Sequence, residues 1–483
     1  MTDGFRGEPR WSVGEEYADR LGNSVWGWIA LFTTEVLEMK KINSLREGEF
    51  LKLFFGCFAT FFLIAAFFMP DRSTMLSGLW QILSQPSKLS TNYFAVGGYG
   101  ATFLNMALVG YLCLALFVLF GGTPNNVSTL AFILTLGFGS WGINILNVWP
   151  TFFGVMAYCL VRREKFGPNV NAMLFSTGIA PLITDLMIRY PNAQAVGFNL
   201  QGILIALVVG FCIGFFLPAG LAHSPKVHKG FDLYSAALPV GMMAFFLNAT
   251  LHNTLGVQLP AGADAALLKI ASRTTVNTFC LILFGTCVIC AFAMGCRPKD
   301  YWHLMTNPEY VNNFTGTYGN AVFLMNVGVF GLFILGYYNL IGATFNGVTF
   351  GILFCMLSTC NSGSHPGNVL PIMLGYAVAS WVCGLLSALL GGSFSYVLNA
   401  QAICVGLCYA NGLSPVTDKY GWRWGFVAAV MHYLLVTSVP SLHGGYCLYN
   451  GGFTAALVCI ILIPNLEHHV KDRQSRRALE AGK

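Results

Sequence analysis

Charged side chains are scarce in this chain. Only 10% of its 483 residues are Asp, Glu, Lys or Arg, against about 25% in an ordinary soluble domain, while 55% are hydrophobic. Two long stretches, residues 89–161 and 310–417, contain none of these four residue types. A water-soluble fold needs a polar surface, and only lipid tolerates this much apolar surface. The shortage of charge therefore excludes a soluble protein and predicts an integral membrane protein in contact with the lipid bilayer.

Several functional motifs are missing as well. The chain has no GxxxxGK[ST] phosphate loop, so it does not drive transport with ATP by itself, and it has neither an HExxH zinc motif nor a GxSxG nucleophile elbow. The excess of six basic residues lies in short loops, without the interleaved aromatic and basic residues that bind nucleic acid. We therefore expect no metal, no cofactor, no nucleic-acid partner and no enzymatic activity.

Apolar runs dominate the rest of the chain. Because a helix rises 1.5 Å per residue, about 20 apolar residues cross a bilayer. Runs of suitable length lie at residues 51–69, 94–120, 196–218, 231–250, 275–296, 319–341, 369–392, 424–439 and 446–464. Runs interrupted by Gly, Asn or Pro lie at residues 127–161, 170–184, 347–360 and 399–412. We predict an all-α polytopic membrane protein with about 10–14 transmembrane segments, some of them broken or re-entrant.

The sequence also repeats itself. Residues 142–150 match residues 363–371 at a shift of 221 residues, which carries Asn147 onto Asn368. Further matches follow in the same order along the chain: Asn105 with Asn326, Gly110 with Gly331, Asn125 with Asn346, residues 178–181 with 412–415, and residues 228–235 with 443–450. Collinear matches of this kind predict an internal duplication.

Basic residues beside the spans favour an inverted second repeat. If every run crosses, each repeat has an odd number of crossings, and the basic clusters near Lys40, Arg162, Lys229, Arg297 and Lys419 all fall on the cytoplasmic side. A parallel arrangement would put several clusters outside. We therefore expect a multi-pass protein of the cell (inner) membrane with both termini in the cytoplasm. Its predicted parts are an N-terminal cytoplasmic or interfacial segment (1–48), repeat one (49–252), a connecting loop (253–274), repeat two (275–466) and a charged cytoplasmic tail (467–483).

One segment carries a family resemblance. With His443-Gly444-Gly445 and the following Leu448-Tyr449-Asn450-Gly451-Gly452-Phe453, the chain resembles, over nearly its full length, a family of uncharacterised bacterial polytopic membrane proteins built on a domain of unknown function. This resemblance implies no catalytic or binding residue. A fainter likeness links Tyr449-Asn450 and Phe345-Asn346-Gly347 to urea-transporter-type channels, which also have inverted repeats.

Polar residues inside the charge-free regions are the candidates for a solute path, because an unsatisfied amide in hydrocarbon costs several kcal/mol. The candidate amides for substrate binding are Asn125, Asn147, Asn346, Asn361, Asn368 and Asn450. Amides donate and accept hydrogen bonds, which suits a neutral polar solute or a partly dehydrated ion. The alternative interpretation is that these asparagines cap broken helices and bond to nearby backbone.

Three histidines and two tyrosines join this set. His365 lies in the polar segment 361–368 and has no histidine at the matched place of the first repeat, which suits substrate contact or a proton-responsive group. His228 and His443 are matched beside Gly-rich bends, and we expect them to gate the path or to brace the Tyr234 and Tyr449 segments, whose tyrosines are candidate substrate contacts.

Asp185 and Asp418 are the repeat-matched acids. Each follows a Gly-x-x-Pro bend, which makes the pair a candidate for coupling transport to a cation or proton. The alternative is simple pairing at the membrane interface, because Arg189 lies one helical turn from Asp185 and Lys419 adjoins Asp418.

The sequence supports one leading function and two alternatives. The leading prediction is a permease or channel for a small polar solute, neutral or singly charged, with a path between two inverted repeats. The first alternative is a membrane-embedded enzyme acting on a lipid-linked or amphiphilic substrate through His365, His443 and an Asp. The second is a non-transporting assembly or sensor subunit. A homo-oligomer is compatible with each.

Overall fold

The described part of the chain is entirely helical. The computed structural model describes residues 39–189, 197–254, 256, 269–307, 309–470 and 475, and these form helices and loops without a strand. Eight helical segments of the described residues are long and apolar enough to cross a membrane: residues 47–68, 93–119, 167–188, 200–228, 273–293, 320–340, 366–389 and 450–469. The predicted all-α, multi-pass membrane protein is thereby confirmed. Three shorter apolar helices accompany them, at residues 126–138, 237–249 and 347–361.

Some predictions fall partly outside the described residues. These are the N-terminal segment before residue 39, most of the connecting loop 253–274 and most of the tail after residue 470. The predicted count of about 10–14 transmembrane segments stays a prediction, because no membrane boundary fixes which short helices cross.

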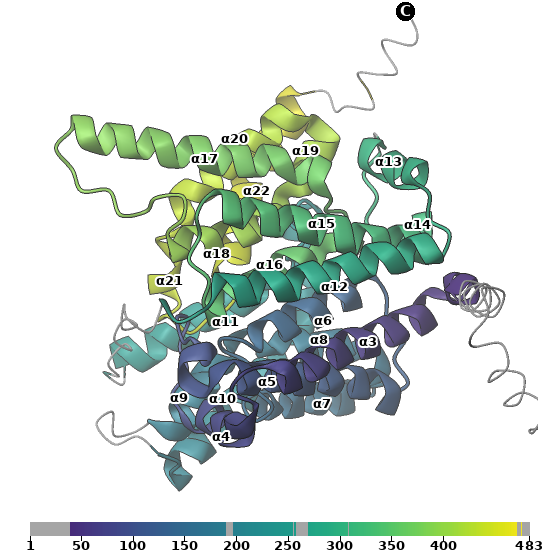
Figure 1. Ribbon diagram of the computed structural model, residues 1–483. Coiled ribbons are helices and arrows are strands. Elements are labelled where there is room, and N and C mark those ends of the chain that lie inside the picture. Colours follow the sequence, from purple (N-terminus) through teal and green to yellow (C-terminus); the bar gives the residue numbers. More distant parts are fainter. Residues whose placement is uncertain are drawn as a thin grey trace, which may run out of the picture.

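The two halves of the chain follow a similar order of helices. The first half contains α3 (Glu47–Phe68), α4 (Met75–Ser84), α5 (Tyr93–Leu119), α6 (Asn126–Phe138), α7 (Trp149–Arg162), α8 (Val170–Ser176), α9 (Ala180–Ile188), α10 (Leu200–His228) and α11 (Ala237–Ala249). The second contains α12 (Arg273–Ala293), α13 (Pro298–Thr306), α14 (Phe314–Tyr318), α15 (Asn320–Leu340), α16 (Gly347–Leu357), α17 (Pro366–Leu389), α18 (Gln401–Ala410), α19 (Ser414–Tyr420), α20 (Trp422–Val436), α21 (Val439–Leu442) and α22 (Asn450–His469). In Figure 1 the first half, purple to teal, lies below the second, green to yellow.

The short helices α6 and α16 begin in the same way. The Asn125 side chain accepts a hydrogen bond from the Ser128 amide, and the Ser128 hydroxyl accepts one from the Asn125 amide. Asn346 and Thr349 make the same reciprocal pair at the start of α16. Such a capping box satisfies two of the backbone donors that a helix start leaves free. The two asparagines therefore act as helix caps.

Helices α6 and α16 cross in opposite directions at the centre of the molecule. The Ser140 hydroxyl, just after α6, donates to the Gly347 carbonyl at the start of α16 (2.7 Å). The Ser362 hydroxyl, just after α16, donates to the Asn126 carbonyl at the start of α6 (3.3 Å). The backbones touch because Gly137 and Gly351 face one another, and a Cβ atom on Gly351 would lie 2.5 Å from the Gly137 carbonyl oxygen. The start of each helix thus lies at the end of the other.

Apolar side chains on the outside mark the surface that meets lipid. Phe68, Leu119, Leu340, Leu389 and Leu390 are each at least 72% exposed. Water would penalise such a surface at about 25 cal/mol per Å², whereas hydrocarbon does not. The polar residues that the sequence singled out lie mostly in the interior instead.

Candidate functional site

The bends that follow α6 and α16 are held by a matched pair of asparagines. The Asn105 amide donates to the carbonyls of Gly139 (2.7 Å) and Ile143 (2.9 Å). The Asn326 amide donates to the carbonyls of Cys360 (2.8 Å) and Ser364 (2.9 Å), which are the same positions shifted by 221 residues. Both asparagines are fully buried. Because a buried carbonyl without a donor costs free energy, these bonds let the chain turn inside the membrane protein.

Asn147 and Asn368 fasten the next turn in the same way. The Asn147 amide bonds to the Gly142 carbonyl and the Thr184 hydroxyl, and its oxygen accepts from the Asn144 amide. The Asn368 amide bonds to the Gly363 carbonyl and to the Asp418 carboxylate (2.8 Å), and its oxygen accepts from the His365 amide. The structure thus places the two asparagines in separate hydrogen-bond clusters and brings only Asn368 close to His365.

His365 stands where the first half has Asn144. The His365 Nδ1 atom accepts a hydrogen bond from the Gly367 amide (3.2 Å), as the Asn144 oxygen accepts one from the Leu146 amide (2.9 Å). The His365 imidazole therefore caps this turn as the Asn144 amide caps the matched one, and its Nε2 atom can bond to another group. Asn361, four residues before His365, bonds to Thr129 of α6 and to Thr315, and it joins the two halves at this end.

The matched tyrosine segments are exchanged between the two halves. The Leu233 amide of the first half donates to the Gly412 carbonyl of the second (3.0 Å), and the Leu448 amide of the second donates to the Gly178 carbonyl of the first (2.8 Å). The neighbouring rings follow: Tyr234 lies against Gly412, and Tyr449 lies against Gly178. Each tyrosine segment thus packs against, and hydrogen-bonds to, the other half of the chain.

The two tyrosines are fully buried, and so is Tyr409 beside them. The Tyr234 hydroxyl lies 2.8 Å from the Cys355 carbonyl oxygen, and the Tyr409 hydroxyl donates to the Leu448 carbonyl (2.6 Å). The rings of Tyr234 and Tyr409 meet edge to face at 4.9 Å. These rings form a polar but closely packed layer where the halves meet.

The matched histidines, His228 and His443, each form a hydrogen bond with the side chain of the residue seven positions later in the chain. The His228 Nε2 atom lies 2.8 Å from the Ser235 hydroxyl, and its Nδ1 atom accepts from the Asp232 amide (3.3 Å). The His443 Nδ1 atom lies 2.5 Å from the Asn450 side-chain oxygen. Both rings brace the turns that lead into α11 and α22. Because Nδ1 of His228 accepts, its proton lies on Nε2 and the ring is neutral.

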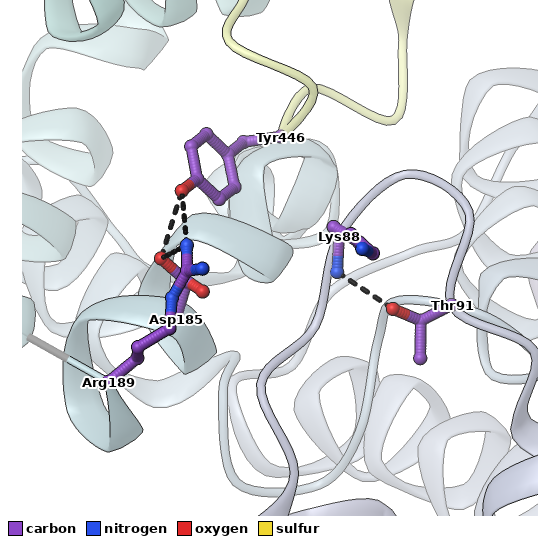
Figure 2. A network of polar contacts seen from close by, with 5 residues as sticks. All are labelled: Lys88, Thr91, Asp185, Arg189 and Tyr446. Atoms are coloured by element: carbon purple, nitrogen blue, oxygen red, sulfur yellow. Dashed lines mark hydrogen bonds and ion pairs between the residues drawn. The ribbon is translucent and has the colours of Figure 1, made fainter. Parts of the chain in front are cut away.

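Asp185 lies in a three-residue network that Figure 2 shows. Its carboxylate pairs with Arg189 (2.8 Å) and accepts a hydrogen bond from the Tyr446 hydroxyl (2.9 Å), while Arg189 also contacts that hydroxyl (3.3 Å). Asp418 bonds to Asn368, and its neighbour Lys419 lies 5.3 Å from the centre of the Phe231 ring. Asp185 thus pairs with a cation, and Asp418 accepts a hydrogen bond from an amide.

Removing the Arg189 guanidinium should show how much this network contributes to the free energy of unfolding. Replacing Arg189 with methionine should lower the free energy of unfolding by about 3 kcal/mol, because Asp185 keeps a buried charge without its partner. Adding Asp185→Asn to that variant should restore most of the loss. Equilibrium unfolding in mixed micelles measures both values, and equal stability of Arg189→Met and the unchanged protein would contradict the prediction.

A first cavity opens at the start of α6. We call it the α6 cavity; its volume is about 390 Å³, and it lies among α6, α8, the end of α10 and residues 228–236. Tyr310, Asn312 and Ser362 close it from the second half. His228 and Asp232 are among its lining residues.

A second cavity of about 430 Å³, the α16 cavity, opens at the start of α16. It lies among α16, α18, α20 and the residues that lead into α22, and Lys88, Leu89 and Ser90 close it from the first half. Asn450 and Gly451 belong to its wall. Because α6 and α16 run in opposite directions, the two cavities lie at opposite ends of this helix pair.

The two cavities are lined by residues at matched positions. At the three shifts seen in the sequence, the lining pairs include Val127 with Val348, Ala172 with Gly406, Leu221 with Val436, Pro225 with Pro440, Gly230 with Gly445, and Ser235 with Asn450. The closing segments match in the reverse sense, Tyr310 with Leu89. Residues at matched positions of the sequence therefore line both cavities.

A third cavity, the α17 cavity, has a volume of about 400 Å³ and is lined by His365, Asn368, Thr417 and Asp418, together with residues 305–307 and 421–422. It gathers three of the residues that the sequence singled out. Of the others, His228 lines the α6 cavity and Asn450 lines the α16 cavity. Asn147, Asn361, Tyr234 and Tyr449 are packed in the interior.

Asp232 is the residue that sequence reasoning missed. It is 2% exposed, lines the α6 cavity and follows His228 by four residues. Matching the two repeats does not single out Asp232, because the matched position in the second repeat is Cys447 and not an acid. An acid within the apolar run 231–250 was the signal that would have found it.

Helix lengths and the apolar surface together define a polytopic α-helical membrane protein. The model of one family, described as a protein of unknown function (DUF1576), matches residues 71–253 and 297–468. The chain belongs to this family, which confirms the predicted resemblance to an uncharacterised family. The likeness to urea-transporter-type channels stays a prediction. No curated protein and no solved structure matches the chain.

Proposed function

We propose that this protein is a permease or channel for a small polar solute, neutral or singly charged, with its path between two repeats of inverted topology. The observation that carries the proposal is the pair of cavities with matched lining residues at opposite ends of the α6–α16 pair. A transporter with inverted repeats needs such a pair, because each repeat builds one entrance.

The contacts at matched positions support the inverted arrangement. Three kinds of contact occur at positions that the sequence repeat matches. They are the caps of α6 and α16, the bonds made by Asn105 and Asn326, and the bonds that Leu233 and Leu448 donate to the other half. Helices α6 and α16 are antiparallel, as inversion requires.

The starts of α11 and α22 take part in the walls of the two cavities or directly follow them. Ser235 and Ala236 end the α6 cavity, and Asn450 and Gly451 end the α16 cavity. The next residues touch, since a Cβ atom on Gly452 would lie 2.5 Å from Cβ of Ala237. The proposed path therefore crosses the start of α11 and α22, beside the buried tyrosine layer. Opening it requires α11 and α22 to separate.

Basic residues give the orientation. Lys229 and Lys419 lie at the end where the α6 cavity opens, since Lys229 adjoins its wall residue Gly230 and Lys419 lies over Phe231. We infer that this end faces the cytoplasm. The α16 cavity then opens to the outside.

Cysteine labelling tests the two entrances. In a cysteine-free background, Ser235→Cys should react with a membrane-impermeant maleimide in inverted membrane vesicles, and Ser441→Cys should react in intact cells. A cysteine at Arg162 should react only in inverted vesicles. Labelling of Ser235→Cys and Ser441→Cys from one and the same side would contradict the inverted repeats, and labelling of neither would contradict aqueous entrances.

Flux in reconstituted vesicles tests transport itself. Shrinkage and reswelling after an osmotic step, followed by light scattering, reports the entry of urea, glycerol, formamide or methylammonium. We expect at least one of these small solutes to enter about ten times faster than through protein-free vesicles, a change equivalent to about 1.4 kcal/mol in the barrier. Chemically unchanged solute must be recovered.

One observation favours a second candidate function, a membrane-embedded enzyme. His365 and Asp418 line the same α17 cavity, so a base and an acid share one hollow. His443 lies elsewhere and bonds to Asn450. Conversion of an amphiphilic substrate that is lost in His365→Asn, a variant that retains the cap, would support this candidate.

A further inference from the structure

We propose that the α6 cavity binds a small cation that carries N–H donors, ammonium or a short primary alkylammonium, through the Asp232 carboxylate. The inference names a solute class for the proposed transport function and therefore rests on it. The site itself is tested by binding alone.

The Asp232 side chain has one oxygen in use and one to spare. Oδ1 accepts a hydrogen bond from the Tyr234 amide (2.9 Å), which holds the carboxylate in place. Oδ2 is buried and has no hydrogen-bond partner, although the residue lines a cavity of about 390 Å³. A buried carboxylate oxygen without a donor is costly, so the site favours a ligand that donates.

A second acceptor points to the same kind of ligand. The side-chain oxygen of Asn171, which also lines the α6 cavity, is buried without a hydrogen-bond partner. An ammonium group offers several donors and a positive charge at once, which suits a cavity wall that contains such acceptors.

The charges around the cavity agree with a cation. Among the described residues that line it, none is Lys or Arg. His228 accepts at Nδ1 from the Asp232 amide and is neutral. Lys229, three residues before Asp232, is paired with Glu467. Asp232 is thus the acidic residue among the described residues that line this cavity. Burial raises its pKa to about 8, so the carboxylate that binds a cation forms as the pH rises toward and above that value.

The fold itself does not require this acid. At the matched place of the second half stands Cys447, although the surrounding turn makes the same contacts: the Leu448 amide reaches a glycine carbonyl as the Leu233 amide does. A turn of this kind therefore forms without a carboxylate. The acid distinguishes the α6 cavity from the α16 cavity, whose wall includes Lys88.

Cavity size limits the ligand. A volume of about 390 Å³ holds on the order of a dozen waters. Ammonium and methylammonium fit with part of their hydration, whereas a nucleotide or polyphosphate does not, and its negative charge would be repelled.

The experiment uses the full-length protein in detergent. Methylammonium chloride, added at constant ionic strength against sodium chloride, should raise the thermal unfolding temperature in a saturable manner. In Asp232→Asn, which retains the oxygen that caps the Tyr234 amide, the dissociation constant for methylammonium should rise at least tenfold. Glu49→Gln removes the same charge from an exposed site and should bind as the unchanged protein does.

Each result decides something. Absence of a saturable shift, an equal shift with sodium, or an unchanged dissociation constant in Asp232→Asn would overturn the site. Flux of a neutral solute without methylammonium binding would leave the proposed transport standing and remove this inference. Saturable binding without flux of any solute would do the reverse.

Discussion

Replacing Gly178 or Gly412 with alanine is expected to destabilise the folded protein strongly. A Cβ atom at Gly178 would lie 2.5 Å from the Tyr449 ring, and one at Gly412 would lie 2.6 Å from the Tyr234 ring. Both rings are fully buried, so they have little room to move. Overpacking of this kind costs about 3 kcal/mol, and it also strains the hydrogen bond through which each glycine carbonyl receives the other half.

The matched control is Gly285→Ala in α12. No heavy atom lies within 4 Å of a Cβ atom there, and the residue is inside a helix, so stability should be kept or raised by about 0.5 kcal/mol. Unfolding in mixed micelles, with surviving monodisperse protein measured by size exclusion, compares the three variants. If Gly178→Ala and Gly412→Ala are as stable as Gly285→Ala, the exchanged segments do not hold the halves together.

Filling either cavity is expected to stop transport. Leu221→Cys places a thiol in the wall of the α6 cavity, and Thr437→Cys places one in the wall of the α16 cavity. A bulky maleimide occupies a large part of a cavity of about 400 Å³, so solute flux should fall at least tenfold in each modified variant. The unmodified cysteine variants should conduct normally.

Sidedness makes this test sharper. In vesicles that hold the protein in one orientation, the Leu221→Cys variant should be blocked by reagent on one side of the membrane only. The Thr437→Cys variant should be blocked by reagent on the other side only. A control thiol at Val161, which is 69% exposed, should react without changing flux. Full flux through labelled Leu221→Cys and Thr437→Cys together would mean that the solute takes another route.

Much of the fold followed from local chemistry that a sequence displays. The scarcity of charged residues predicted helices in lipid, because no other regular element satisfies its own backbone within one segment. The Gly, Asn and Pro residues that interrupt the runs 127–161 and 347–360 predicted broken helices. Capping of such helices by Asn125 and Asn346 was one of two alternatives that the sequence left open, and the capping boxes are present at α6 and α16.

The candidate site was harder to predict because its residues meet through turns. Asn147 and Asn368 occupy matched positions, yet their amides reach Thr184 in one half and Asp418 in the other. Which neighbour an amide finds depends on where two distant bends come to lie. Asp232 escaped notice for a related reason, because duplication highlights what the halves share and hides where they differ.

The exchange between Gly178 and Leu448 also sets a schedule for biosynthesis. These positions lie 270 residues apart. At about 5–20 residues per second, a ribosome needs tens of seconds to span that distance. Throughout this interval the Gly178 carbonyl lacks the hydrogen bond from the Leu448 amide, and the space beside Gly178 lacks the Tyr449 ring. The first half must therefore persist as an unfinished intermediate, and protection of that intermediate falls to the insertion machinery or to lipid until synthesis ends.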